Sequence, residues 1–219
     1  SESLIRFKLP EIGHEYNYRK IKRNSCEGIQ VDFIQNGAVF YGSLLDFSAI
    51  SFFVKITAVP PQSFWLINPG NMVHIVLKKD QDILYSGKCN IIRQTHGQKT
   101  RSFVLRPDKN QMKRFKPKEF RSPRHKLNPL PNIIFNHPII RKMISLEVED
   151  ISGSGISVEE YQEDSVLMMG LIIPELTIEF ANNFAIKCKA QVVYRNDYKT
   201  DDDKLHIKCG IAFLEMDMQ

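Results

Sequence analysis

The sequence predicts a mainly β protein that consists of two consecutive small β-barrels. Apolar and polar residues alternate over long segments that are rich in Val, Ile and Phe, which is typical of half-buried strands. Turn residues separate these segments at regular intervals, as in sandwiches and barrels, and closing a sheet into a barrel removes its exposed edges. The second half of the chain then repeats the order of the first half, which indicates a tandem duplication.

The first half shows the alternation most clearly between residues 29 and 57. Asn36-Gly37 divides this stretch and predicts a hairpin, because both central residues of the favoured two-residue turn need positive φ. Pro60-Pro61 ends the alternation, and Asn68-Pro69-Gly70 predicts another turn. Three further strands are expected, at residues 72–79, 84–94 and 101–107.

The second half corresponds to the first segment by segment. Residues 137–158 match residues 35–54 in pattern, and the later strand-like segments follow in the same order. The expected organisation is an N-terminal barrel with a basic arm, a basic linker and a C-terminal barrel, at residues 1–107, 108–126 and 127–219. Lys and Arg outnumber acids in the linker, so it is expected to seek anions.

Composition narrows the class of protein. No apolar run is long enough to span a bilayer, and the first residues contain no apolar signal core, so we expect a cytoplasmic protein without a membrane span. The four cysteines lack metal-ligand spacing and are expected to be reduced and mostly buried. The alternative is that Cys188 and Cys209, on neighbouring expected strands, form a disulfide.

Sequence signals for catalysis and for metal binding are missing. The histidines form no H-x-x-x-H pair, and the acidic run at residues 201–203 lacks the alternating spacing of a calcium loop, so no metal site is expected. We find no G-x-S-x-G, no P-loop and no paired catalytic carboxylates, and therefore expect neither an enzyme nor a cofactor. Trp65 is expected to pack in the core or in a loop.

Two short motifs follow one another along the chain. Arg19 and Arg23 form R-x-x-x-R in the N-terminal arm. Asp150, Ser152 and Gly155 form D-x-S-x-x-G where a strand of the second unit ends. Taken alone, each motif has an ordinary explanation, because basic arms are common and Asp, Ser and Gly are turn residues.

Together, the arginine motif followed by a barrel with D-x-S-x-x-G resembles the PilZ family, whose domains bind the bacterial second messenger cyclic di-GMP. The resemblance covers nearly the whole chain as two units. The first unit has the arginines, with Asp46 and Ser48, but has Ser51 where the family has Gly. In the second unit, the spacing of Arg121 and Arg124 is one residue too short.

The resemblance implies two sets of ligand-binding residues. In the C-terminal unit Arg124 takes the role of the second family arginine, with Arg121 as the nearest candidate for the first and His125 beside them. The implied sets are Arg121, Arg124, His125, Asp150, Ser152 and Gly155 in the C-terminal unit, and Arg19, Arg23, Asp46 and Ser48 in the N-terminal unit.

These residue types suit a ligand with two phosphates and two guanines. Arg binds phosphate, or guanine O6 and N7, with two parallel hydrogen bonds and stacks on a base. A carboxylate accepts from the guanine N1–H and N2–H₂ groups, and a serine hydroxyl adds an adjustable partner. Glycine permits positive φ and a close approach of the backbone to the ligand.

We therefore expect a non-catalytic receptor for cyclic di-GMP, in which binding orders the basic arm, reorients the domains and signals to an unidentified protein effector. The C-terminal unit is slightly favoured as the binding unit, with its site at the junction of the two units, and the N-terminal unit stays an alternative. Two other functions are open. The basic linker could contact DNA in a nucleic-acid-binding regulator, or both sites could have decayed in an adaptor that binds protein only.

Overall fold

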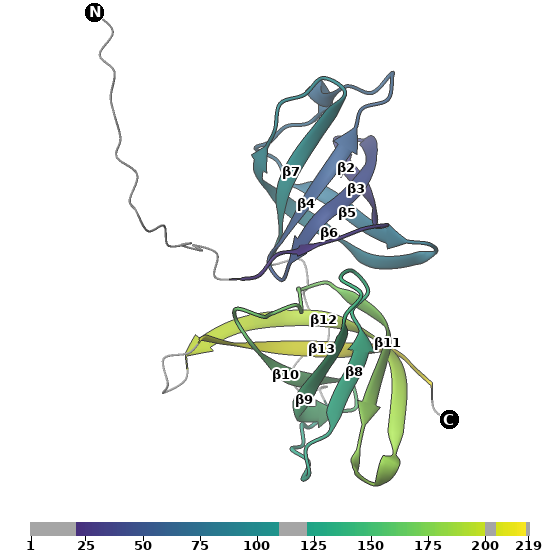
Figure 1. Ribbon diagram of the computed structural model, residues 1–219, viewed down its shortest axis with the longest axis vertical. Coiled ribbons are helices and arrows are strands. Elements are labelled where there is room, and N and C mark those ends of the chain that lie inside the picture. Colours follow the sequence, from purple (N-terminus) through teal and green to yellow (C-terminus); the bar gives the residue numbers. More distant parts are fainter. Residues whose placement is uncertain (1–20, 110–121, 200–204, 218–219) are drawn as a thin grey trace, which may run out of the picture.

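The computed structural model describes residues 21–109, 122–199 and 205–217. These residues form two β-barrels, one above the other in Figure 1, and confirm the predicted fold class. The only helical elements in the described ranges are two 3-10 turns, η1 (Phe64–Leu66) and η3 (Ala181–Asn183). None of the helices there is long and apolar enough to cross a membrane.

The N-terminal barrel is a ring of six antiparallel strands in the order β3-β2-β5-β6-β7-β4, closed by pairing of β4 with β3. A short strand, β1, is added along β3. The strands are β1 (Asn24–Ser25), β2 (Gln30–Gln35), β3 (Ala38–Ser48), β4 (Ser51–Thr57), β5 (Val73–Lys79), β6 (Asp82–Gln94) and β7 (Thr100–Pro107).

The C-terminal barrel closes in the order β9-β8-β11-β12-β13-β10. Its strands are β8 (Asn132–Asn136), β9 (Met143–Ser152), β10 (Gly155–Tyr161), β11 (Ile172–Glu179), β12 (Ala185–Lys199) and β13 (Leu205–Asp217). Replacing each strand of the first ring by the strand six places later reproduces this order, so the two rings have the same topology. This is the arrangement that the repeated sequence pattern predicts.

The hairpin between β2 and β3 forms as predicted. Asn36 and Gly37 have φ of 52° and 78°, and Gln35 pairs with Ala38 across them. Asn and Gly tolerate this left-handed conformation better than other residues, and the twist of such a turn matches that of the flanking strands.

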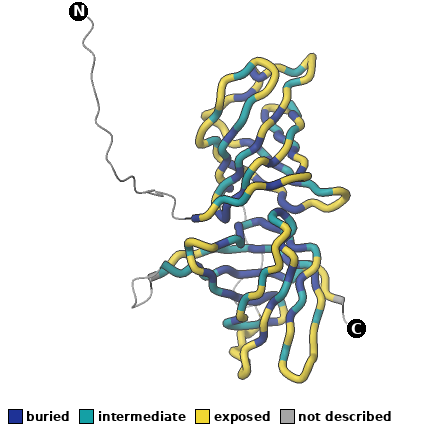
Figure 2. Tube along the Cα trace, in the orientation of Figure 1, coloured by how far each residue is buried: buried dark blue, intermediate teal, exposed yellow. Residues whose placement is uncertain are grey.

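Each barrel is filled by the inward-facing residues of its strands, which appear as the dark blue segments in Figure 2. In the N-terminal barrel Phe33 packs against Phe103 and Phe40, with ring centroids 4.9 and 6.2 Å apart. The C-terminal barrel uses mainly aliphatic side chains, such as the fully buried Ile156 and Val192. Burying one such side chain stabilises the fold by about 1.5–3 kcal/mol.

The two barrels touch at one end of each. The backbone N–H of Lys22 donates to the carbonyl of Glu163, at 3.1 Å. The His137 ring, fully buried at the start of the β8–β9 turn, lies 5.3 Å from the ring of Phe47 in the other barrel. The end of β3 thus packs against the rim of the C-terminal barrel.

The four cysteines are free and buried, as expected. The alternative of a disulfide is wrong: Cys188 and Cys209 do lie on neighbouring strands, but Cys188 pairs with Met216 and Cys209 with Arg195, so a disulfide cannot join them. The expectation for Trp65 is also wrong, because 95% of its surface is exposed.

Candidate functional site

The D-x-S-x-x-G motif of the C-terminal unit lies at the hairpin between β9 and β10. Ser152 pairs with Gly155 across Gly153-Ser154. The Ser152 hydroxyl donates to the carbonyl of Gly155, at 3.1 Å, and is 3.4 Å from the N–H of Ser154, so this side chain braces the turn. Asp150 precedes the turn on β9.

A backbone bridge positions the arginine of this unit. The N–H groups of His125 and Ile151 each donate to the other's carbonyl, at 2.9 and 3.0 Å. This bridge fixes the chain beside β9, so Arg124 lies next to Asp150 and their side chains form an ion pair. The Arg124 side chain is still 42% exposed. Within the described residues this ion pair is its one polar contact.

A lysine that the sequence analysis does not single out completes this surface. Lys208 on β13 forms an ion pair with Glu149 and lies 3.9 Å from Asp150. Burial opposes the charge of Lys208, but the hydrogen bond to Glu149 and the charges of Glu149 and Asp150 raise its pKa above the ordinary value. Asp150 therefore lies between two cations. Alternation along β13 predicts that Lys208 points outward, but the strand pairing that brings it near Asp150 is long-range.

Gly155 has a different role from the one expected. It is not at positive φ. A Cβ at this position would lie 2.2 Å from the carbonyl oxygen of Ile211 on β13. Glycine is therefore needed where β10 and β13 approach closely to close the barrel, and not for a left-handed turn.

The N-terminal unit repeats this arrangement. Asn24 pairs with Phe47 as His125 pairs with Ile151, which places Arg23 beside Asp46. Arg23 Nη1 donates to both carboxylate oxygens of Asp46, at 2.6 and 3.0 Å. Arg23 and Arg124 thus occupy equivalent positions.

Ser51 makes the difference between the two units. Its hydroxyl accepts from Arg23 Nη2 at 3.0 Å and lies 2.9 Å from the Ser48 hydroxyl. Arg23 is therefore held by two side chains, and only 20% of it is exposed. A glycine at this position, as in the C-terminal unit, has no hydroxyl to hold the arginine.

A pocket of about 570 Å³ opens beside the N-terminal motif. Arg23, Ser48 and Ser51 line it together with Arg93 of β6, and Gln162 of the C-terminal barrel forms part of its wall. This volume is in the range of about 300–1,000 Å³ that is usual for small-molecule sites.

The expected place of the C-terminal site is wrong, because it is the N-terminal motif that lies at the junction. Phe47, next to Asp46, contacts His137 at the far end of β9 from Asp150. At about 3.3 Å per residue, that end lies about 30 Å from the Ser152–Gly155 turn along the 10 residues of β9 and about 20 Å along the 7 residues of β10. Sequence order alone suggested a junction site, because the linker precedes the second unit.

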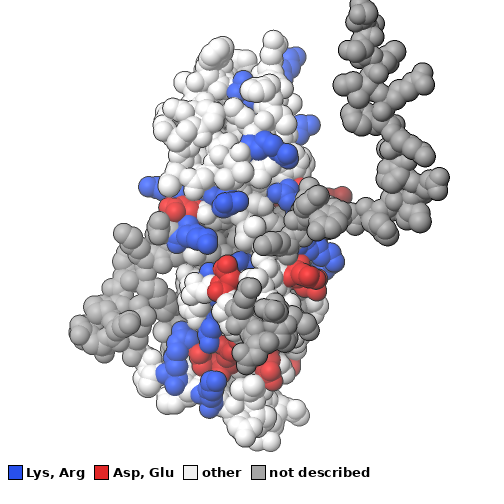
Figure 3. All heavy atoms as spheres, turned by 90° about the vertical axis from the view of Figure 1, so that its left-hand side faces the viewer, with Lys and Arg blue, Asp and Glu red and all other residues white. Residues whose placement is uncertain are grey.

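Two predicted site residues, Arg19 and Arg121, lie outside the described residues, as does most of the linker. The other eight lie near a motif turn or the strand bridge beside it. Within the described ranges there is no cluster of three metal-ligating side chains. On the face shown in Figure 3, Lys and Arg are spread over both barrels, whereas Asp and Glu lie mainly at the level of the junction and on the C-terminal barrel.

Comparisons with known proteins give structural neighbours only. No protein-family model matches the chain, and no curated protein matches it. Among solved structures, it is similar to apo MrkH of K. pneumonia, with 13% identity, a TM-score of 0.39, and 86% of this chain and 80% of that chain covered. It is also similar to Escherichia coli YcgR in complex with cyclic di-GMP, with 12% identity, a TM-score of 0.36, and 85% and 76% covered.

A third structure, the PilZ domain of YcgR from Escherichia coli with cyclic di-GMP, matches with 14% identity and a TM-score of 0.38 over 44% of this chain and 79% of that chain. YcgR thus contains a PilZ domain, and PilZ is the family that the motifs resemble. The function proposed below rests on the residues of this chain.

Proposed function

We propose that this protein is a non-catalytic receptor for cyclic di-GMP, built from two PilZ-like barrels. One observation carries the proposal. In each barrel the same backbone bridge places an arginine against the aspartate of the motif, Arg23 with Asp46 and Arg124 with Asp150. Such a pair presents phosphate- and guanine-binding groups side by side.

The C-terminal motif is the principal site in this proposal. Among the residues that the structure describes, Arg124 makes a single ion pair, and Lys208 adds a second cation near Asp150. In the N-terminal unit, a ligand must first displace Ser51 from Arg23. Breaking a hydrogen bond to a charged group costs about 1.5–3 kcal/mol, or roughly one to two powers of ten in affinity.

Binding would act on the domains through the linker. Its first residues, up to Lys109, lie at the junction, and its last residues lead into Arg124 at the other end of the C-terminal barrel. A ligand that draws Arg121 and its neighbours onto Asp150 would therefore pull on the linker, whose first residues are at the junction. This pull would reorient the two barrels, and a protein effector would recognise the new arrangement. Small-angle scattering with and without cyclic di-GMP tests this step, with Arg124→Ala as the control that should show no change.

Substitutions at the two motifs test the binding proposal. We expect Arg124→Ala and Asp150→Asn each to weaken binding of cyclic di-GMP at least tenfold in a calorimetric titration, and Asp46→Asn to have a smaller effect. Circular dichroism on each variant shows whether it folds. Equal binding by the unaltered chain and by Arg124→Ala would contradict the assignment of the C-terminal site.

A further inference from the structure

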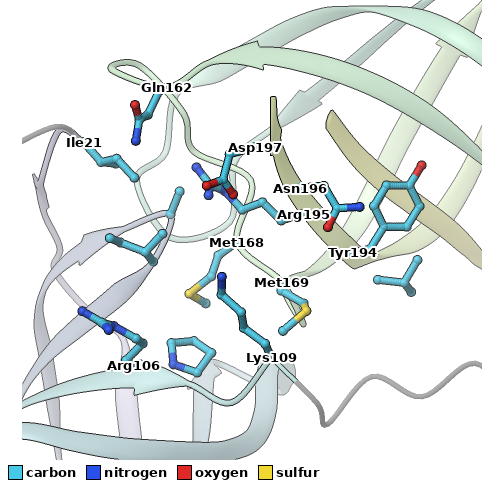
Figure 4. A pocket seen from close by; sticks show the side chains of 14 residues that line it. Ile21, Arg106, Lys109, Gln162, Met168, Met169, Tyr194, Arg195, Asn196 and Asp197 are labelled. Carbon is cyan, nitrogen blue, oxygen red and sulfur yellow. The ribbon is translucent and has the colours of Figure 1, made fainter. Parts of the chain in front are cut away.

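The two barrels enclose a second cleft, which adjoins the pocket beside the N-terminal motif and shares Ile21, Ile50 and Gln162 with it. None of the predicted site residues that the structure describes lines this cleft. It has a volume of about 750 Å³ and lies between the end of β7 and the rim of the C-terminal barrel (Figure 4). Both barrels supply its walls, so a ligand in it would touch both.

The cleft carries uncompensated positive charge. Arg106 and Lys109 come from the N-terminal barrel, and Figure 4 shows the Lys109 side chain extending into the space below Met168. Neither cation has an ion-pair partner among the described residues. Asp197 is the one acid among the described residues that line the cleft, against three cations including Arg195. An anion with two or more charges would match this balance.

A buried network holds the opposite wall in place. The carboxylate of Glu160, whose pKa is raised by burial, accepts hydrogen bonds from the Ser165 hydroxyl at 2.8 Å and from the N–H of Val166 at 2.9 Å. Arg195 Nη2 donates to the Ser165 hydroxyl at 3.0 Å. The loop that leads to Met169 is therefore fixed before any ligand arrives, which lowers the entropy that binding must overcome.

The rest of the lining suits a flat ring with polar edges. Met169 and Tyr194 are partly exposed in the cleft, and a methionine adapts its shape to a ring. Ile50, 39% exposed, adds apolar surface at the rim. Gln162 and Asn196 supply both donors and acceptors.

We propose that this cleft is a nucleotide-binding site distinct from the pairs Arg23–Asp46 and Arg124–Asp150. Arg106 and Lys109 hold the phosphates, and Met169 and Tyr194 hold the base. A nucleotide there would tie the barrels together, whether or not the motifs bind cyclic di-GMP.

The test uses the full chain with both motifs disabled by Asp46→Asn and Arg124→Ala. This chain is titrated calorimetrically with cyclic di-GMP, GTP and inorganic phosphate. The same titrations are made on a second chain that also carries Arg106→Ala and Lys109→Ala. The matched control adds Lys55→Ala and Lys142→Ala instead, which remove the same charge from exposed positions outside the cleft. Thermal melts of all three chains show whether they fold.

We expect saturable binding of at least one nucleotide, weakened about tenfold or more by the cleft substitutions and unchanged in the control. The absence of nucleotide binding, or equal binding after the cleft substitutions, would overturn the proposal. Phosphate binding as tight as that of either nucleotide would overturn the role of the base. Failure here leaves the motif proposal intact, because that proposal is judged on binding by the unaltered chain and on the effect of the motif substitutions, with Arg106 and Lys109 in place.

Discussion

His137 makes the stability of this protein sensitive to mild acid. Its ring is fully buried where the barrels meet. Its Nε2 lies 3.1 Å from the carbonyl of Val166, and its Nδ1 lies 3.3 Å from the N–H groups of Ile139 and Ile140. Nδ1 must accept from these groups, so Nε2 carries the proton and the ring is neutral. Burial lowers the pKa of His137 from 6.5 to about 4.

This shift predicts the size and direction of the effect. The unfolded chain takes up the proton near pH 6.5, whereas the folded protein resists it until about pH 4. The contribution is therefore fully present above pH 6.5 and is lost as the pH falls. The expected loss of unfolding free energy, relative to pH 7.5, is about 2 kcal/mol at pH 5 and about 3 kcal/mol at pH 4.

Urea unfolding curves between pH 7.5 and pH 5, for the unaltered chain and for His137→Gln, measure this loss. The variant lacks the titrating ring, so between pH 7.5 and pH 5 the free energy of unfolding of the unaltered chain should fall by about 2 kcal/mol relative to that of the variant. Glu160 and Glu159, whose pKa values are raised, act in the opposite direction and are common to both chains. A constant difference over this range would refute the reasoning.

Three other predictions follow from packing and burial. Gly155→Ala should lower the free energy of unfolding in urea by about 1–3 kcal/mol, because the new Cβ would lie 2.2 Å from a backbone oxygen. Gly153→Ala should lower it less, because its Cβ would meet only a side chain, at 3.3 Å. Equal losses would contradict the account. Ser51→Gly frees Arg23 and should raise the affinity of the N-terminal motif for cyclic di-GMP by about ten- to a hundredfold in calorimetry. No gain would show that Ser51 does not compete. All four cysteines should resist iodoacetamide at pH 8 in the folded protein, since burial raises the pKa of Cys89, for example, to about 12; labelling of the folded chain within minutes would count against this.

Local signals in the sequence predict much of the fold. The Asn36-Gly37 turn forms because its backbone preference is local. Strand alternation and the repeated order predict two barrels of the same topology. The family resemblance also places Arg23 with Asp46 and Arg124 with Asp150 in common sites, and the side chains of each pair are in contact.

Long-range contacts account for what sequence reasoning missed. Lys208 reaches Asp150 only because β13 pairs with β10, and strand pairing over such a distance leaves no local signal. Gly155 is explained by the carbonyl of Ile211 on the facing strand, and not by a turn conformation. Packing around His137 decides which end of the C-terminal barrel meets the N-terminal barrel. The place of each motif relative to the junction could therefore not be predicted from the order of the segments.

The most direct test of the central claim is a calorimetric titration of the unaltered chain with cyclic di-GMP, with GTP as the control ligand at the same concentrations. The account predicts saturable binding of cyclic di-GMP that is at least tenfold tighter than any binding of GTP and that Arg124→Ala weakens. No heat and no thermal shift at high concentrations of cyclic di-GMP would contradict the receptor function.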